Sequence, residues 1–335
     1  MNFDSMSILT IWTAVAIYAA AFIAYAFDLA RRSQVAADAK AVAPERELVG
    51  ASVGGPAGGA GKAGAAASRT GSAGDGGTAP TRFVMARIGT ALTTLGFLFH
   101  LAGVVLRGIA AGRVPWSNMY EFAMTGTLLI IAVYIAVNIW FDLKYLGTFI
   151  VGLVVVLLGG AATGFYTQVV PLADPLKSVW LVIHVFVASL GTAFFALAFA
   201  LSVFQLMQAR RESRILAEVA KPGPRFLATL PTADRLESLA YRFATVGFIL
   251  WTFTLIAGSI WANDAWGRYW GFDTKETWTF IIWVLYAGYI HARATRGWRG
   301  SRSAWLSIVG FAAVLFNFTI VNLFFKGLHV YSGLS

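Results

Sequence analysis

Long runs of apolar residues recur along this chain, and shorter polar segments separate them. About twenty consecutive apolar residues in a helix span the hydrocarbon core of a bilayer. Runs close to that length cover residues 8–30, 84–106, 119–140, 147–167, 180–204, 242–261, 278–296 and 304–325. The pattern therefore predicts an all-α polytopic membrane protein with about eight transmembrane helices.

The first run has two interpretations. A cleavable signal peptide is one, because Ala-Tyr-Ala at 24–26 resembles a cleavage site. Three features argue against a signal peptide. The residues before the run include Asp4 and no basic residue, the run is longer than a typical signal-peptide core, and an arginine pair follows directly at 31–32. We expect residues 1–30 to form a transmembrane helix with its N-terminus outside.

Residues 31–82 differ in composition from the rest of the chain. Between Gly50 and Pro80 there are 11 Gly and 9 Ala, with Ser, Thr and Pro among them. Such a composition cannot bury a core and behaves as a flexible coil. We therefore expect a disordered cytoplasmic linker at 31–82, followed by a seven-helix membrane domain at 83–335.

The distribution of basic residues sets the orientation. If the N-terminus is outside, eight spans place both termini outside, and the inside segments carry 20 of the 26 Lys and Arg. Cytoplasmic loops characteristically carry this excess. The net charge of +10 is thereby explained by topology, and we expect no nucleic-acid partner.

Composition removes several functional classes. Only 13% of the residues are charged, against about 25% in a typical soluble domain. The chain contains no cysteine, which excludes disulfides, thiol catalysis and iron–sulfur clusters. Without a C-x-x-C-H motif, the chain carries no covalently attached c-type haem of its own.

One polar segment is unusually aromatic. Residues 261–278 contain four tryptophans among carboxylates, an arginine and a lysine, and apolar runs lie on both sides. Amphipathic rings collect at the membrane–water interface. The segment therefore predicts an aromatic platform on the external face, or, alternatively, an aromatic belt that anchors two helices.

The four histidines fall at different depths. His184, at the start of a span, and His329, just beyond the last span, both lie on the face of the aromatic segment. His291 lies roughly 20 Å below that face at 1.5 Å per helical residue, and His100 lies in the outer half of its span. Ionisable groups in spans are functional candidates, although any single one could be a buried, hydrogen-bonded side chain.

Two external histidines beside an aromatic platform favour haem. Neutral imidazole is a common axial ligand of haem iron, and two imidazoles give a six-coordinate iron. Aromatic faces can pack the porphyrin, and Arg or Lys can meet its propionates. Zinc is the alternative metal, but it favours a tighter cluster of His, Cys or carboxylates.

Several segments then resemble one family. The stretch Trp-Gly-x-x-Trp-x-Phe-Asp-x-Lys-Glu-Thr-Trp at 266–278 resembles the "WWD" signature of haem-handling proteins, as found in the CcsA/ResC family of system II cytochrome c maturation. Segments 112–121, 176–185, 289–293 and 327–331 resemble that family's external loop and its three histidine regions, in order. The resemblance covers about residues 85–335.

This resemblance implies that the protein takes haem b from the cytoplasmic side and holds it non-covalently at the external face of the plasma membrane. There the haem would be joined to the C-x-x-C-H thiols of apocytochrome c by a holocytochrome c synthase (haem lyase) complex. His184 and His329 would be axial ligands of the external haem, and His291 would bind a haem in transit. The implied partners are a CcsB/ResB-like membrane protein and thiol-reducing proteins.

The expected haem platform lies in the tryptophan-rich segment 261–278 and consists of Trp261, Trp266, Gly267, Trp270, Phe272, Asp273 and Trp278. Arg268 and Lys275 are candidate propionate contacts. Glu276 is expected first as a helix cap, because anions are favourable at a helix N-terminus.

Two features depart from a simple match. The family usually has Trp where Phe272 stands, so the aromatic face is kept but the indole N–H is lost. The depth of His100 does not match that of His291, so a structural role and an accessory haem contact both stay open for His100.

Three other functions remain as alternatives. A haem exporter or chaperone of system I shares the aromatic signature. A b-haem electron-transfer subunit would need paired histidines at matching depth on two spans. A haem-free anchoring protein is the third.

Overall fold

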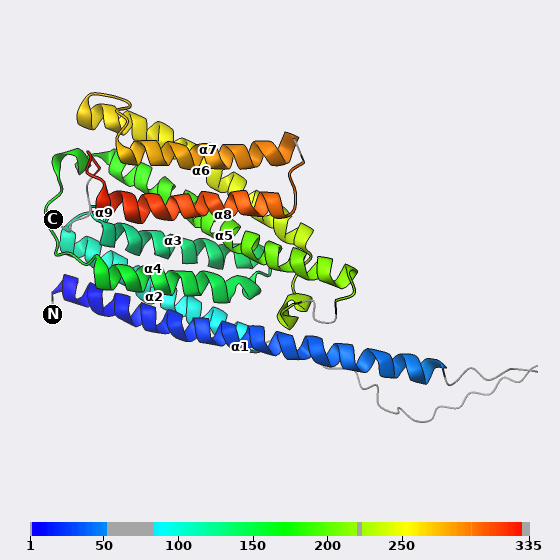
Figure 1. Cartoon of the computed structure of the whole chain (residues 1–335). Helices are drawn as coiled ribbons and strands as arrows, with labels where there is room; N and C mark the ends of the chain where they lie inside the picture. Colours follow the sequence, from blue (N-terminus) through cyan, green and yellow to red (C-terminus); the bar gives the residue numbers. More distant parts are fainter. Residues whose placement is uncertain (1, 52–83, 220–222, 296, 330–335) are drawn as a thin grey trace, which may run out of the picture.

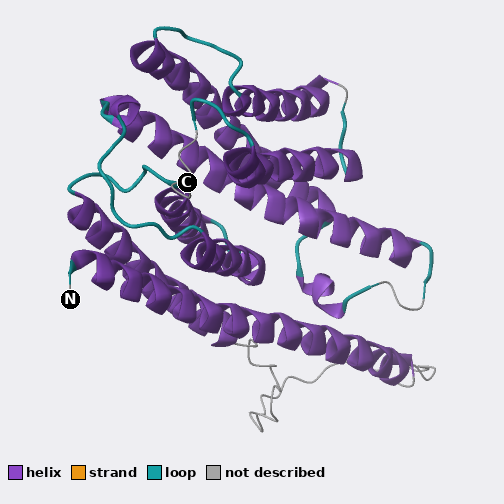
Figure 2. Ribbon diagram, turned by 60° about the vertical axis from the view of Figure 1, so that its left-hand side comes forward, coloured by secondary structure: helices purple, strands orange, loops and turns teal. Residues whose placement is uncertain are grey.

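The computed structural model describes residues 2–51, 84–219, 223–295 and 297–329, and for residues 35–51 it describes the backbone alone. These residues form helices joined by loops, with no strand among them (Figure 2). The long helices lie side by side in one bundle, with α1 extending beyond it at one end (Figure 1). The predicted all-α fold is confirmed.

The described helices agree with the apolar runs. Each predicted run falls largely within one helix, or within the continuous stretch formed by α8, a π-helical turn and α9. The helices are α1 (Phe3–Ala51), α2 (Val84–Ala111), α3 (Met119–Trp140), α4 (Gly147–Gly164), α5 (Val179–Leu216), α6 (Ala233–Trp266), α7 (Thr274–Thr295), α8 (Ser301–Phe316) and α9 (Asn322–Phe324), with the π-helical turn at Asn317–Val321 and short 3-10 turns at Lys144–Leu146, Asp174–Leu176 and Arg225–Thr229.

Seven helical stretches among the described residues are long and apolar enough to cross a membrane. Helix α7 is not one of them: its Lys, Glu, His and Arg residues lie near its two ends, and Thr, Trp and Tyr residues lower the mean hydropathy of the stretch between them. It is nevertheless 22 residues long, or about 33 Å at 1.5 Å per residue. It also lies alongside α8 in the bundle (Figure 1). We therefore interpret α7 as an eighth, less apolar span.

Helix ends alternate as the eight-span prediction requires. The starts of α1, α3, α5 and α7 lie at the same end of the bundle as the ends of α2, α4, α6 and α9 (Figure 1, left). We call this the outer end, following the predicted orientation. His184, His329 and the tryptophan-rich segment all belong to it.

Helix α1 departs from the predicted boundary at residue 30. It continues to Ala51, so the beginning of the predicted linker is helical, while residues 52–83 lie outside the described residues. Helix α1 contacts α2 closely because Gly89 and Gly96 leave room for tyrosine rings. A Cβ at these glycines would lie 2.9 Å from Tyr25 and 2.7 Å from Tyr18. This close contact favours the membrane-helix interpretation of the first run.

A buried carboxylate joins three helices and the loop before a fourth at the inner end. Glu237 of α6 accepts hydrogen bonds from Arg293 Nε at 3.1 Å, the Gly300 backbone N–H at 2.7 Å and Gln205 Nε2 at 3.3 Å. These groups come from α7, the loop before α8, and α5. The inner ends of the helices that carry the outer site are thus held together by charge-assisted hydrogen bonds.

Candidate functional site

The two histidines expected on the external face line the same cavities at the outer end. His184 of α5 and His329 after α9 together line one cavity of about 110 Å³ and a neighbouring one of about 90 Å³. The larger of the two is also lined by Trp116, Asn118, Trp261, Lys275 and Asn322. A third cavity of about 140 Å³ continues from His184 toward the middle of the bundle, where its lining is mostly apolar. The fold therefore brings together two histidines 145 positions apart in sequence.

His184 is held between α5 and α6. Its ring centroid lies 5.6 Å from that of Trp261. Gly258 makes the close approach possible, because a Cβ there would lie only 2.7 Å from Cε1 of His184. The ring edge that carries Nδ1 faces α6, since a Cβ at Gly258 would also lie 3.0 Å from Nδ1, and the Thr254 backbone carbonyl is a hydrogen-bond partner of the same ring.

His329 is oriented by a carboxylate. Its Nδ1 lies 2.7 Å from Oδ2 of Asp273, and the other oxygen of Asp273 accepts the Leu328 backbone N–H at 3.0 Å. The hydrogen bond with His329 lowers the pKa of the Asp273 carboxyl below its ordinary value. The ionised carboxylate therefore accepts from Nδ1–H, so that Nε2 carries the lone pair of the neutral ring.

The predicted platform is only partly assembled around the histidines. Trp261 packs beside His184, and the Trp266 centroid lies 4.8 Å from that of His329. Trp270 lines the smaller shared cavity. Trp278 does not join them: its ring packs against Phe316 at 4.3 Å between centroids, because the first turn of α7 directs it toward the π-helical end of α8.

Phe272 also differs from the expectation. Its residue surface is 81% exposed and its backbone has a φ of 56°. A non-glycine residue with left-handed backbone is uncommon. The side chain lines none of the cavities that the histidines share, so it presents an aromatic face to the outside rather than to the pocket.

Capping residues fix the shape of the tryptophan-rich loop. Gly267 ends α6 in the left-handed conformation with a φ of 69°, which glycine adopts without steric cost. Glu276 accepts the backbone N–H of Gly271 at 2.8 Å and of Asp273 at 3.1 Å. This is a capping box at the start of α7, so the role expected for Glu276 is confirmed.

The two candidate propionate contacts occupy different places. Lys275 lines both shared cavities and the deeper one. Its Nζ donates to Oδ1 of Asn322 at 2.6 Å, and no carboxylate of the described residues forms an ion pair with it. Arg268 lies against Gly271 and does not line these cavities. Lys275 alone is placed to meet a ligand carboxylate there.

The two remaining histidines lie elsewhere. His100 is fully buried, with Nε2 2.8 Å from the Met124 carbonyl and Nδ1 3.4 Å from the Tyr18 hydroxyl. Because a carbonyl only accepts, Nε2 carries the proton and Nδ1 accepts from Tyr18. Both ring nitrogens are engaged, which favours the structural role. His291 is exposed near the inner end of α7 and shares no cavity with His184 or His329.

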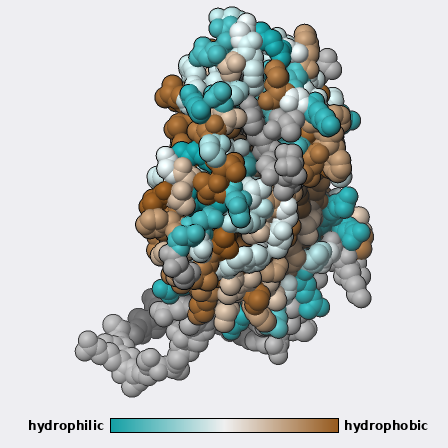
Figure 3. Space-filling view, turned by 90° about the vertical axis from the view of Figure 1, so that its left-hand side faces the viewer, coloured by the Kyte–Doolittle hydropathy of each residue, from teal (hydrophilic) through white to brown (hydrophobic). Residues whose placement is uncertain are grey.

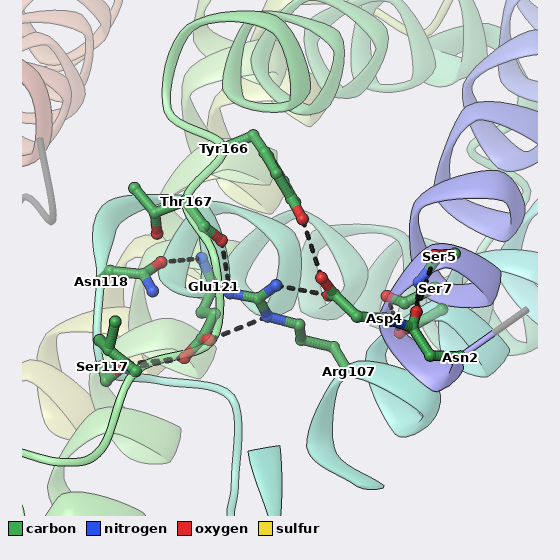
Figure 4. A network of polar contacts seen from close by, with 12 residues as sticks. Asn2, Asp4, Ser5, Ser7, Arg107, Ser117, Asn118, Glu121, Tyr166 and Thr167 are labelled. Atoms are coloured by element: carbon green, nitrogen blue, oxygen red, sulfur yellow. Dashed lines mark hydrogen bonds and ion pairs between the residues drawn. The ribbon is translucent and has the colours of Figure 1, made fainter. Parts of the chain in front are cut away.

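A buried charge network supports the outer loops, and sequence reasoning missed it (Figure 4). The fully buried Arg107 donates to Asp4 at 2.6 Å and to Glu121 at 3.0 Å. Glu121 also accepts from Arg113 at 2.8 Å and from the Ser117 backbone at 3.0 Å. The sequence feature that could have indicated this network is the segment 112–121, where an arginine, an asparagine and a glutamate stand directly before an apolar run.

The surface of the outer end is mixed in character. Figure 3 looks onto this end and shows hydrophilic side chains interspersed with apolar ones.

The fold and the site together define a class of protein. This is a polytopic membrane protein with an eight-helix bundle and a bis-histidine pocket at one face, where two imidazoles and two indoles surround one outer cavity.

Comparisons with known proteins identify the family. Residues 116–329 match the family model described as "Cytochrome C assembly protein". The "Cytochrome c biogenesis protein CcsA" of Guillardia theta is 34% identical over 269 residues, covering 74% of this chain and 86% of that protein. That of Synechococcus elongatus is also 34% identical, over 73% of this chain and 87% of its own. This chain belongs to the cytochrome c assembly family and is a cytochrome c biogenesis protein.

The fold is similar to that of a protein of known structure. "Cytochrome c Heme Lyase CcmF" superposes with a TM-score of 0.59 at 15% identity, covering 95% of this chain. The chain spans 47% of the length of that structure. At this identity the likeness concerns the fold alone.

Proposed function

We propose that this chain binds haem b non-covalently between His184 and His329 and presents it at the external face of the plasma membrane to apocytochrome c. The observation that carries the proposal is the pair of imidazoles lining one cavity, with Trp261 beside one ring and Trp266 beside the other. Imidazole nitrogens are common haem-iron ligands. Asp273 holds one ring in a fixed tautomer, and Gly258 lets α6 hold the other.

The chemistry of attachment needs positioning more than a reactive residue. In thioether formation, the S–H bond of an apocytochrome thiol breaks, a C–S bond forms at one vinyl carbon, and a proton adds to the other. The thiols belong to the substrate, in keeping with a chain that has no cysteine. Holding the two reactants together makes the addition effectively unimolecular. The chain would act within a holocytochrome c synthase complex, with thiol-reducing proteins keeping the C-x-x-C-H motif reduced.

A second haem position is proposed at His291. This residue is exposed on α7 at the end opposite the outer cavity, and an ionisable side chain facing lipid is unfavourable. His100 cannot complete a pair with it, because both His100 nitrogens are engaged. A CcsB/ResB-like membrane protein would therefore cover His291 and supply the other ligand to a haem in transit.

Histidine variants test the outer site. We expect His184→Ala and His329→Ala each to lower the haem that copurifies with the full chain and the yield of holocytochrome c. Added imidazole should restore part of both, because it replaces an axial ligand. Unchanged haem content in both variants would overturn the ligand assignment.

Product analysis separates the alternatives. Covalent haem on co-expressed C-x-x-C-H apoprotein supports attachment, and its dependence on a CcsB/ResB-like protein tests the partner. Haem bound without transfer to apoprotein would instead favour an exporter, a chaperone or an electron-transfer subunit. Purified protein without haem would favour the anchoring alternative.

A further inference from the structure

Two hydrogen-bond donors in the loop before α3 lack partners. Trp116 Nε1 and Asn118 Nδ2 are both buried without a hydrogen bond among the described residues. Asn118 is only 5% exposed. Native proteins satisfy nearly all buried polar groups. Two unsatisfied donors two positions apart therefore call for an explanation, and neither residue belongs to the histidine or tryptophan motifs.

The orientation of the Asn118 amide is fixed by the helix that follows. The Glu121 backbone N–H donates to Oδ1 of Asn118 at 2.9 Å, which makes Asn118 the N-cap of α3. Because only the oxygen can accept, Nδ2 must occupy the other branch of the amide. The Glu121 carboxylate fixes the loop before α3, because it accepts hydrogen bonds from the Ser117 backbone N–H and hydroxyl, each at 3.0 Å (Figure 4).

Both residues line the larger cavity shared by the histidines. Lys275, which carries a third donor, lines the same cavity. No Asp or Glu of the described residues lines this cavity. Lys275 keeps N–H donors beyond the one used by Asn322, since an ammonium carries three. The cavity is therefore lined by residues that carry an indole N–H, an amide and an ammonium. The Asp273 carboxylate, whose charge acts on Lys275, accepts from His329 and Leu328 and does not line this cavity.

We propose that Trp116, Asn118 and Lys275 form a carboxylate subsite that binds one propionate of the haem held between His184 and His329. The inference rests on the proposed haem function. It adds the residues that determine the orientation of the haem, with one propionate edge toward α3. An ionised carboxylate accepts several hydrogen bonds at once, and bonds with a charged partner are the stronger ones. The subsite also explains the rigid support that Glu121 and the two arginines give to this loop.

Haem b and haem dimethyl ester distinguish the subsite from the axial ligands. Both compounds carry the same iron and vinyl groups, but the ester lacks ionised propionates. The full chain, purified in detergent and freed of haem, is titrated with each compound, and binding is followed by the Soret band. Asn118→Asp is the informative variant, because aspartate also caps helices well but replaces the amide donor by a negative charge.

We expect Asn118→Asp to weaken haem b binding by about a hundredfold, from the lost donor and the like charge. Trp116→Phe keeps a ring and loses the N–H, so roughly a tenfold loss is expected. Neither change should alter binding of the dimethyl ester by more than about twofold, within the scatter of neutral substitutions. Trp180→Phe is the matched control, since the Trp180 indole donates to Asp264 outside the cavity.

The outcomes separate the two proposals. Equal losses for haem b and its ester in Asn118→Asp, or no loss for either, would overturn the subsite while leaving the histidine site intact. Failure of the unaltered chain to bind either compound would instead overturn the proposed function. The melting temperature of each variant is measured as well. Because aspartate also caps a helix, Asn118→Asp should leave the melting temperature unchanged, and a loss of haem b affinity then lies in binding.

Discussion

The fit between Gly258 and His184 yields a prediction with a calculable displacement. In Gly258→Ala, the new Cβ would lie 2.7 Å from Cε1 and 3.0 Å from Nδ1 of His184. Carbon atoms in contact are about 3.5–4.0 Å apart, so the imidazole or α6 must move by about 1 Å. A displacement of that size at a reacting or binding group can cost about a hundredfold.

The substitution perturbs position without removing any functional group. Alanine favours a helix over glycine by about 1 kcal/mol, which partly offsets an overpacking cost of about 1–3 kcal/mol. We therefore expect the fold to persist while haem affinity falls by roughly tenfold to a hundredfold. A titration followed by the Soret band measures haem affinity. The absorption spectrum shows whether the iron keeps its low-spin, six-coordinate state.

A matched glycine supplies the control. A Cβ at Gly160, within α4, meets nothing within 4 Å, so Gly160→Ala should bind haem as the unaltered chain does. Wild-type affinity and an unchanged spectrum in Gly258→Ala would refute the reasoning, because the His184 ring would then not be confined by α6.

Two further predictions concern buried carboxylates. Asp273→Asn keeps a contact to His329 but removes the charge, and we expect a tenfold to hundredfold loss of haem affinity; retention of full affinity would show that Asp273 does not orient the ring. Glu237→Gln removes the carboxylate that Arg293 and Gly300 share and should lower unfolding stability in detergent by about 3 kcal/mol. Its effect on haem affinity should be small, because it lies at the inner end, and an unchanged melting temperature would contradict the assignment.

The location of the site was predictable from sequence because depth in a membrane is a one-dimensional property. Apolar run length and helix rise place each residue along the bilayer normal. The predicted run 119–140 coincides with α3 at Met119–Trp140. The same arithmetic put His184 and His329 on one face and His291 far from it, as the structure has them.

The rotation of each helix about its axis was not predictable in the same way. Each residue turns the side-chain direction by about 100° in a helix of 3.6 residues per turn, and spans that are apolar all round give little sign of which face is inward. Trp278 was assigned to the platform because it belongs to the tryptophan-rich stretch, although its ring packs against Phe316. His100 stayed open until Tyr18 and Met124 were found at its two nitrogens.

By itself, the amino-acid sequence determined the all-α membrane class, the alternation of the spans, the family, and the two histidines and tryptophan-rich segment that mark the outer end. The class and the alternation of the spans follow from local hydropathy, since every backbone polar group within the membrane must be satisfied inside its own helix. The family follows from the motifs in segments 112–121, 176–185, 266–278, 289–293 and 327–331. Only the tertiary structure decided which side chains surround the histidines. Asn118, Trp116 and Gly258 enter the site through contacts between helices distant in sequence, and no periodicity along a single helix specifies those contacts.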